Sequence, residues 1–196
     1  MTVKIEAEVK GESTPPTPVT DENLVNGDFF IIRNTTNADK PGLDTGDGAD
    51  EETLWIFYFK DYSPLAPSDE LEHAYLTLTL QPARDAIGGL NTDFFWIETL
   101  PIIFLADALK NVFPDLTFDR VPDPDTDPSQ TTNRNIDSVI PINQATKIKF
   151  DLLDHYTSAE ILNVFFSSLQ GRITMRYGDD AFISFTCLEL IRKEPA

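Results

Sequence analysis

Aspartates crowd two stretches of this sequence, and carboxylates at short spacing are the ligands that Ca²⁺ prefers. The first stretch, residues 37–52, is rich in Gly and Asp, and the second, residues 119–135, contains three prolines. Neither is an EF-hand, and in the second stretch Pro128 and Arg134 stand where that loop needs Gly and Glu. Calcium is therefore the predicted cofactor, with solvated loops that bind no metal as the alternative. The predicted ligands are Asp44, Asp47, Asp50, Asp123, Asp125 and Asp127.

Residue types that usually perform catalysis are scarce. His73 and His155 are the two histidines, and their spacing does not fit the H-E-x-x-H zinc motif. The sequence also lacks a G-x-S-x-G nucleophile elbow, a Walker A loop and a dinucleotide fingerprint. Cys187 is the only cysteine, which excludes an internal disulfide, and its apolar neighbours indicate a small core residue. We therefore expect a protein that is not an enzyme and predict no catalytic residues.

Aromatic side chains offer a different chemistry, because rings on an outward sheet face can stack on the C–H groups of a sugar. Trp55 and Tyr58 lie in the strand-like run LWIFYFK, and Tyr62 follows shortly after it. We predict these three residues as the ligand-binding set, with burial in the core as the alternative. The predicted partner is accordingly a glycan or a protein.

The charge balance excludes several classes of partner. The chain has 33 Asp and Glu against 15 Lys and Arg, a formal charge of −18. Such a charge repels nucleic acid and anionic membranes.

The most apolar stretch, residues 94–109, is interrupted by Glu98, Pro101 and Asp107 and cannot span a bilayer. Residues 1–11 lack the apolar centre of a signal peptide. We expect neither nucleic-acid binding nor membrane insertion.

The elements that must position these residues are clearest between residues 146 and 190. The segment KIKFDLL alternates apolar and polar residues, which predicts a strand with one buried face. Thr157 and Glu160 have the spacing of a capping box, and Gly171 can take the left-handed conformation that ends a helix. The sequence therefore predicts a helix between these positions.

A hairpin is predicted after this helix. Residues 172–177 alternate, Gly178-Asp179 supplies a two-residue turn, and a return strand is expected over 180–190. Further strands are predicted at residues 26–33, 54–60, 73–80 and 93–101, and a second short helix at residues 102–113. Many short strands with few helices predict a mainly β protein, a single antiparallel jelly-roll-like β-sandwich with one or two short helices.

The N-terminal residues are set apart from this domain. Residues 3–9, VKIEAEV, alternate like a strand, but the segment that follows is rich in Pro, Ser and Thr and is typical of a linker. We therefore divide the chain into residues 1–20, the strand and linker, and residues 21–196, the sandwich domain. The strand can form the local edge of its own domain, or it can pair with a neighbour and make a homo-oligomer through residues 3–9.

The run LWIFYFKDYSPLAPSDELEHAYLTLTLQP, followed later by IKFDLL, a short helix and GRITMRYGDDAFISFTCLEL, resembles β-sandwich domains of secreted bacterial proteins. The resemblance is to DNRLRE-type modules and to extracellular domains of cyanobacterial proteins that carry a PEP-CTERM sorting tail. Ala74, Leu76 and Leu78 match the A-x-L-x-L strand of these domains, whereas no sorting tail follows Ala196. The resemblance implies a non-catalytic surface or carbohydrate-binding role and carries over no site residues.

The expected function is therefore that of a non-catalytic interaction module of extracellular or cell-surface type. It would bind a glycan or a protein, with Ca²⁺ assisting through the two acidic stretches. The alternative is a structural subunit of a filament, virion or other assembly, in which the N-terminal strand pairs with a neighbouring copy.

Overall fold

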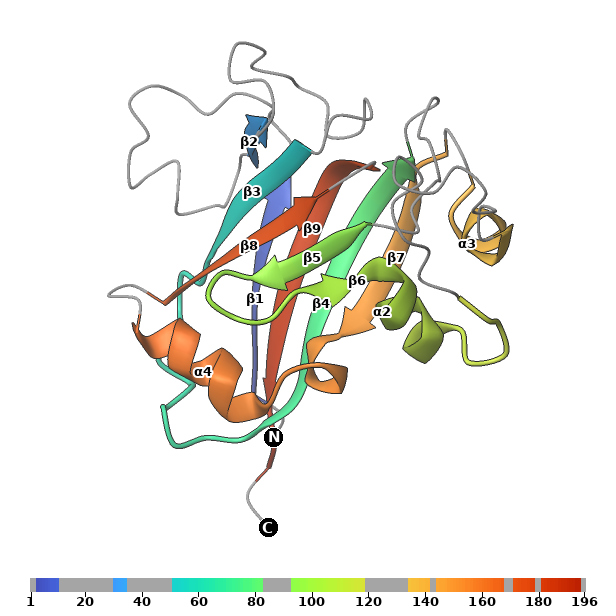
Figure 1. Cartoon of the computed structure of the whole chain (residues 1–196). Coiled ribbons are helices and arrows are strands. Elements are labelled where there is room, and N and C mark those ends of the chain that lie inside the picture. Colours follow the sequence, from blue (N-terminus) through green and yellow to red (C-terminus); the bar gives the residue numbers. More distant parts are fainter. Residues whose placement is uncertain are drawn as a thin grey trace.

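Two β-sheets pack against each other in the described part of the chain (Figure 1). The computed structural model describes residues 3–10, 30–34, 51–82, 93–118, 134–141, 144–167, 171–178 and 181–194. Sheet A consists, in spatial order, of β1 (Val3–Lys10), β9 (Ala181–Arg192), β4 (Leu71–Pro82) and β7 (Thr146–Asp151). Sheet B consists, in spatial order, of β2 (Phe30–Asn34), β3 (Glu51–Tyr58), β8 (Arg172–Gly178), β5 (Phe94–Ile97) and β6 (Ile103–Phe104). The predicted mainly β sandwich is confirmed.

The strands pair as a nested set. β5 pairs with β6, β4 with β7, β3 with β8 and β1 with β9, always antiparallel, and successive pairs alternate between sheet B and sheet A. A single long antiparallel ribbon wound around one core produces this nesting, which is that of a jelly roll with two Greek keys. β2 lies outside the set and pairs with β3. The predicted jelly-roll-like arrangement is confirmed.

β8 and β9 do not form the hairpin predicted from the sequence, so that prediction is wrong. β8 lies in sheet B between β3 and β5, whereas β9 lies in sheet A between β1 and β4. A period of two shows which residues of a strand share a face, but it does not show which sheet the strand joins. The chain therefore passes from one sheet to the other between these two strands.

The core lies between the inner faces of the two sheets, where alternate residues of each strand are buried. Sheet B contributes aromatic rings to it, among them Phe95, whose ring centroid is 5.2 Å from that of Phe150 in sheet A. Burying one Leu or Phe side chain contributes about 1.5–3 kcal/mol, so these rows decide which face of each strand points inward. The inward row predicted for β4 is completely buried: Ala74, Leu76, Leu78 and Leu80.

β1 is the edge strand of sheet A. All eight of its residues have partners in β9, and its apolar row, Ile5, Ala7 and Val9, is buried in the core. The sequence set this strand apart from the sandwich domain, whereas the structure includes its apolar row in the common core. The boundary expected at residue 20 lies outside the described residues.

In the described part of the chain, short helices and one 3-10 turn cover parts of the sandwich. They are α2 (Leu105–Val112), α3 (Arg134–Val139), η2 (Leu152–Asp154) and α4 (Ser158–Ser167). Helices near the positions of α2 and α4 were predicted, whereas α3 was not, because it begins at the end of a Pro- and Asp-rich stretch. No helix in the described residues is long and apolar enough to cross a membrane.

The predicted capping box of α4 is present. The Glu160 amide donates to the Thr157 hydroxyl oxygen at 3.2 Å, and the Thr157 amide donates to the Glu160 carboxylate at 2.8 Å. These backbone and side-chain hydrogen bonds to Thr157 lower the pKa of Glu160. Gly171 has the expected left-handed conformation, with φ of 62°, and the ring of Tyr62 packs where a Cβ would stand.

Candidate functional site

The aspartates predicted to bind calcium lie outside the described residues. They are Asp44, Asp47, Asp50, Asp123, Asp125 and Asp127. Among the residues that the structure does describe, no three His, Cys, Asp or Glu side chains gather as a metal site. The described part of the chain is thus a β-sandwich without a metal site, and calcium stays a prediction that concerns those six residues.

The three aromatic residues predicted to bind a ligand lie in three different environments. Trp55 is on the inner face of β3 and is 0% exposed. Tyr58 is half-buried on the outer face of sheet B, with the Arg172 guanidinium carbon 5.5 Å from its ring centroid. Tyr62 is 37% exposed and turns its ring edge-on to Phe165 at 5.8 Å. Stacking on a sugar needs an open ring face, and Trp55 has none.

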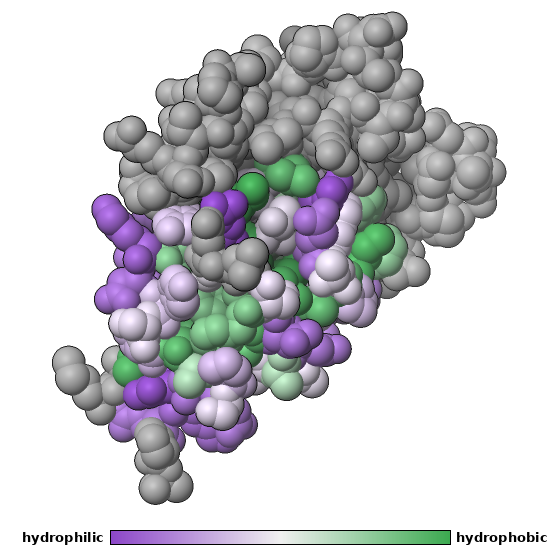
Figure 2. Space-filling view, turned by 90° about the vertical axis from the view of Figure 1, so that its left-hand side faces the viewer, coloured by the Kyte–Doolittle hydropathy of each residue, from purple (hydrophilic) through white to green (hydrophobic). Residues whose placement is uncertain are grey.

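The side of the molecule on which α4 and β3 lie is mixed in polarity. In its described part, hydrophobic residues gather near the middle and hydrophilic residues surround them (Figure 2). Among the described residues, the large apolar side chains that stand furthest out are Tyr62, at 37%, and Ile102, at 50%. Single exposed apolar side chains are normal on soluble proteins. The described residues on this side therefore do not define a binding site.

The outer face of sheet A is different, because four strands that are distant in the sequence turn polar residues outward there. Strand register aligns these residues in rows across the sheet. One row consists of Glu8, Cys187, Thr77 and Lys149. The next row consists of Glu6, Glu189, Tyr75 and Asp151. Along the strand direction, Lys4 and His73 lie beyond the Glu6 row, and Lys147 lies beyond the Glu8 row.

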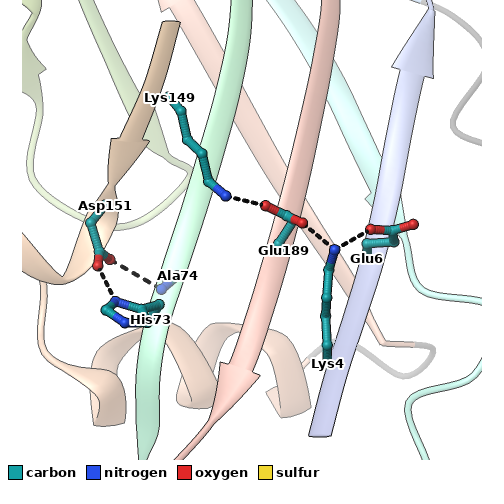
Figure 3. A network of polar contacts seen from close by, with 7 residues as sticks. All are labelled: Lys4, Glu6, His73, Ala74, Lys149, Asp151 and Glu189. Atoms are coloured by element: carbon teal, nitrogen blue, oxygen red, sulfur yellow. Dashed lines mark hydrogen bonds and ion pairs between the residues drawn. The ribbon is translucent and has the colours of Figure 1, made fainter. Parts of the chain in front are cut away.

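A chain of ion pairs crosses the outer face of sheet A (Figure 3). The Lys149 ammonium lies 2.7 Å from one carboxylate oxygen of Glu189, and the Lys4 ammonium contacts the other. Lys4 also pairs with Glu6 at 2.8 Å. Glu189 is the centre of the network, since its side chain is only 14% exposed whereas the two lysines are about half exposed. Three strands, β7, β9 and β1, are thereby linked through their side chains.

The network shifts the pKa values of its members. Hydrogen bonds from Lys149 and Lys4 lower the pKa of Glu189 from the ordinary value of 4.5. Hydrogen bonds to Glu189 and Glu6 raise the pKa of Lys4. Both groups therefore stay charged at neutral pH, and the network keeps its pattern of charges there.

The lowered pKa of Glu189 predicts a pH-dependent contribution to stability. A folded-state pKa below the unfolded value stabilises the protein above pH 4.5, and this contribution is lost as the pH falls through the folded-state pKa. We expect Glu189→Gln to lower the free energy of unfolding by about 1 kcal/mol at pH 7, since the lysines are half exposed. Urea unfolding of both proteins between about pH 7 and pH 3 should show this difference shrinking. A stability difference that stays constant over this pH range would contradict the lowered pKa of Glu189.

A hollow of about 440 Å³ lies beside this network on the outer face of sheet A. Thr77 and Cys187 lie at its base, and both are short, almost buried side chains between longer neighbours. The hollow exists because the two central strands carry small residues in one row, while the flanking strands carry long charged ones. Its other main lining residues are Glu6, Glu8, Lys147, Lys149 and Phe185.

The two sides of the hollow have opposite charge. Glu6 and Glu8 on β1 form an acidic wall, and Lys147 and Lys149 on β7 form a basic wall. Three strand spacings of about 4.8 Å separate these strands, which places the walls about 14 Å apart at the backbone. The outer face of sheet A is therefore polarised across the strands, and a bound molecule would be oriented by that polarity.

His73 is hydrogen-bonded, His155 is partly buried and Cys187 is buried. His73 Nδ1 lies 2.7 Å from Asp151, whose other oxygen accepts from the Ala74 amide at 3.1 Å. Burial lowers the pKa of His155, and nearby Asp154 and Asp107 oppose that shift. Burial raises the pKa of Cys187 to about 11, so its thiol is protonated at neutral pH. The outer face of sheet A thus supplies charges and hydrogen-bonding groups that a rigid sheet holds in fixed positions.

Fold and site together define a jelly-roll β-sandwich domain with a polarised, charged outer sheet face. Comparisons with family models, with curated proteins and with solved structures found no match. The resemblance to secreted bacterial sandwich domains stays an expectation from sequence.

Sequence reasoning missed the residues of this face as a site. The signal was present in the alternation of VKIEAEVK and TKIKFD, which marks Glu6, Glu8, Lys147 and Lys149 as outward residues of two strands. What the alternation does not give is the strand order that sets β1 and β7 at opposite edges of one sheet.

Proposed function

We propose that this chain is a non-catalytic binding domain whose partner is a protein, bound through the outer face of sheet A. The observation that carries the proposal is the hollow between the acidic wall and the basic wall. Complementary charges fix the orientation of a protein partner and speed its association. A rigid β-sheet face holds such charges in fixed positions, as a specific interface requires.

A protein is favoured over a glycan because cations cover the rings next to the hollow. Lys149 Nζ lies 3.8 Å from the ring centroid of Tyr75, and Lys147 Nζ lies 4.8 Å from that of Phe185. A sugar that stacks on either ring must displace the ammonium group and lose its cation–π contact. Charged side chains of a protein partner can pair with the walls without that loss.

A binding role is favoured over catalysis by the partners of the groups that could do chemistry. His73 is held by Asp151, and no hydroxyl or thiol in the described residues is hydrogen-bonded to either histidine ring. A histidine base activates a nucleophile only when the two are within hydrogen-bond reach. With its raised pKa, the Cys187 thiol is a poor nucleophile at neutral pH.

The extracellular or cell-surface setting and the calcium requirement belong to this proposal as well, on the strength of the sequence. If residues such as Asp44 and Asp125 bind Ca²⁺ with the millimolar to submillimolar affinity of extracellular modules, calcium stabilises the folded state. We expect about 10 mM Ca²⁺ to raise the midpoint of thermal unfolding of EDTA-treated protein by about 3–5 °C. Mg²⁺ is the control, and an unchanged midpoint in scanning calorimetry would remove calcium from the proposal.

The partner class is tested by presenting the full chain to both kinds of ligand. We expect no binding above background on a printed glycan array, and capture of a protein from the secreted fraction of the source cells. The matched variants are Glu8→Lys and Lys147→Glu on the walls, with Lys110→Glu on α2 as a control that makes the charge change of Lys147→Glu outside this face. Capture should be lost in both wall variants and kept in the control. Glycan binding, or capture that ignores the walls, would refute the proposal.

Assembly into a larger structure is the second candidate, and the position of β1 favours it. β1 ends sheet A, and among the described strands only β9 pairs with it. An edge strand can accept a further strand from a neighbour through backbone hydrogen bonds. Pairing through β1 predicts an oligomer in solution whose mass does not change with Lys147→Glu, because β7 lies at the far edge of the sheet.

A further inference from the structure

We propose that the outer face of sheet A binds a second copy of this chain, face to face, about a two-fold axis parallel to the strands. This inference rests on the proposed function, because it names the protein partner of the same surface. It differs from pairing through the edge of β1, because it uses side chains from both edges of the sheet.

The charge pattern of the face is complementary to itself. The acidic wall on β1 and the basic wall on β7 lie at opposite ends of the strand order β1-β9-β4-β7. A two-fold axis that runs between β9 and β4, parallel to the strands, brings β1 of one copy opposite β7 of the other. Each acidic wall then faces a basic wall, and the same contact occurs twice.

Strand register determines which residues meet. Glu8 and Lys149 stand at the two ends of one row, with Cys187 and Thr77 between them. The axis preserves the position along the strands, so Glu8 comes opposite Lys149 of the second copy and diagonal to its Lys147. The short side chains in the middle of the row leave room for water between the copies, so this interface is wet.

The acidic residues of the neighbouring row tolerate this approach. Glu6 comes opposite Asp151 of the second copy, and both are satisfied within their own chain. Glu6 pairs with Lys4 at 2.8 Å. Asp151 accepts from the Ala74 and Leu153 amides at 3.1 Å each and lies 2.7 Å from the ring of His73. Hydrogen bonds to these carboxylates reduce the repulsion between like charges.

The outer face of sheet A carries little of the net negative charge of the chain. The seven described charged side chains of the face are three lysines and four carboxylates, a formal sum of −1, whereas the whole chain has −18. Two copies therefore repel each other less through the outer face of sheet A than the net charge of the whole chain suggests. At about 0.15 M salt the Debye length is about 8 Å, which screens the distant charges more than those in contact.

The test is the solution mass of the full chain, measured by sedimentation velocity and light scattering at about 0.15 M salt. A charged and wet face of this size predicts a weak dimer, with a dissociation constant of about 10–100 µM. Glu8→Lys and Lys147→Glu place one wrong charge on each wall and leave the ion-pair network of Figure 3 intact. Each should weaken the dimer at least about tenfold.

Mixing the two variants is the decisive step. In the mixture one contact is native, and in the other the new lysine is opposite Lys149 but diagonal to the new glutamate. The heterodimer should therefore form more tightly than the mean of the two variant homodimers. Lys110→Glu, the control on α2, should dimerise like the wild type. Circular dichroism of every variant confirms that it is folded.

Three outcomes would overturn the inference. They are a monomer at every concentration up to about 1 mM, a dimer that Lys147→Glu does not weaken, and a heterodimer no tighter than the mean of the two variant homodimers. The second outcome would indicate pairing through β1, because β7 lies at the far edge of the sheet. A wild-type monomer that still captures a different protein in a wall-dependent way would leave the proposed function standing.

Discussion

Replacing Trp55 by alanine is expected to lower the free energy of unfolding by about 3–5 kcal/mol. Trp55 is among the largest fully buried side chains of the core, and its ring meets that of Phe57 edge-on at a centroid distance of 6.4 Å. Alanine leaves a cavity that the two rigid sheets cannot close. Guanidinium chloride unfolding followed by circular dichroism measures the effect, since the substitution removes one of two tryptophan fluorophores.

Tyr58→Ala is the matched control, because Tyr58 lies in the same strand but on the half-buried outer face of sheet B. We expect a loss of about 1–2 kcal/mol, mainly from its contact with Arg172. Equal losses at both positions would mean that Trp55 does not lie in the core. A loss of partner binding in folded Trp55→Ala protein, without loss of stability, would return Trp55 to the ligand-binding set.

Tyr177→Phe is expected to cost about 1.5–3 kcal/mol, although it removes only one oxygen atom. The Tyr177 hydroxyl donates to Asp93 at 2.5 Å, and both residues are 0% exposed. A hydrogen bond to a buried carboxylate is stronger than one to a neutral acceptor, and water does not replace it at this depth.

The control for this prediction is Tyr156→Phe. Tyr156 is 4% exposed, and its hydroxyl donates at 2.6 Å to the backbone carbonyl of Pro101, a neutral acceptor. Its loss should cost about 0.5–1.5 kcal/mol, less than that of Tyr177→Phe. Thermal and urea unfolding of the two variants give the order directly. A larger loss for Tyr156→Phe than for Tyr177→Phe would show that the hydrogen bond from Tyr177 to Asp93 contributes little to stability.

Much of the fold was predictable because its strands obey a period of two. The inward row of β4 and the capping box of α4 follow from residue types alone. The run that contains Trp55 did not reveal its inner face, because apolar residues occupy both faces of LWIFYFK. The false hairpin between β8 and β9 has the same origin, since alternation does not identify the sheet that a strand joins.

The candidate site was harder to predict than the fold. Its residues come from four strands, and Glu6 and Lys149 belong to one network only because Glu189 of β9 lies between them. Strand order and register produce that proximity, and both depend on contacts between residues far apart in the sequence. Local patterns can mark each residue as outward, but they do not assemble the two walls.

The pairing of β1 with β9 has a consequence for synthesis. Val3 stands opposite Arg192, so β1 meets its partner only after nearly all the intervening chain has left the ribosome (Figure 1). At about 5–20 residues per second this takes on the order of 10 s, and contacts of such long range also slow folding. During that wait the row Ile5, Ala7 and Val9 is an unpaired hydrophobic strand. The charges at alternate positions of β1 oppose aggregation of this nascent strand, and the glutamates among them later form the acidic wall on the outer face of sheet A.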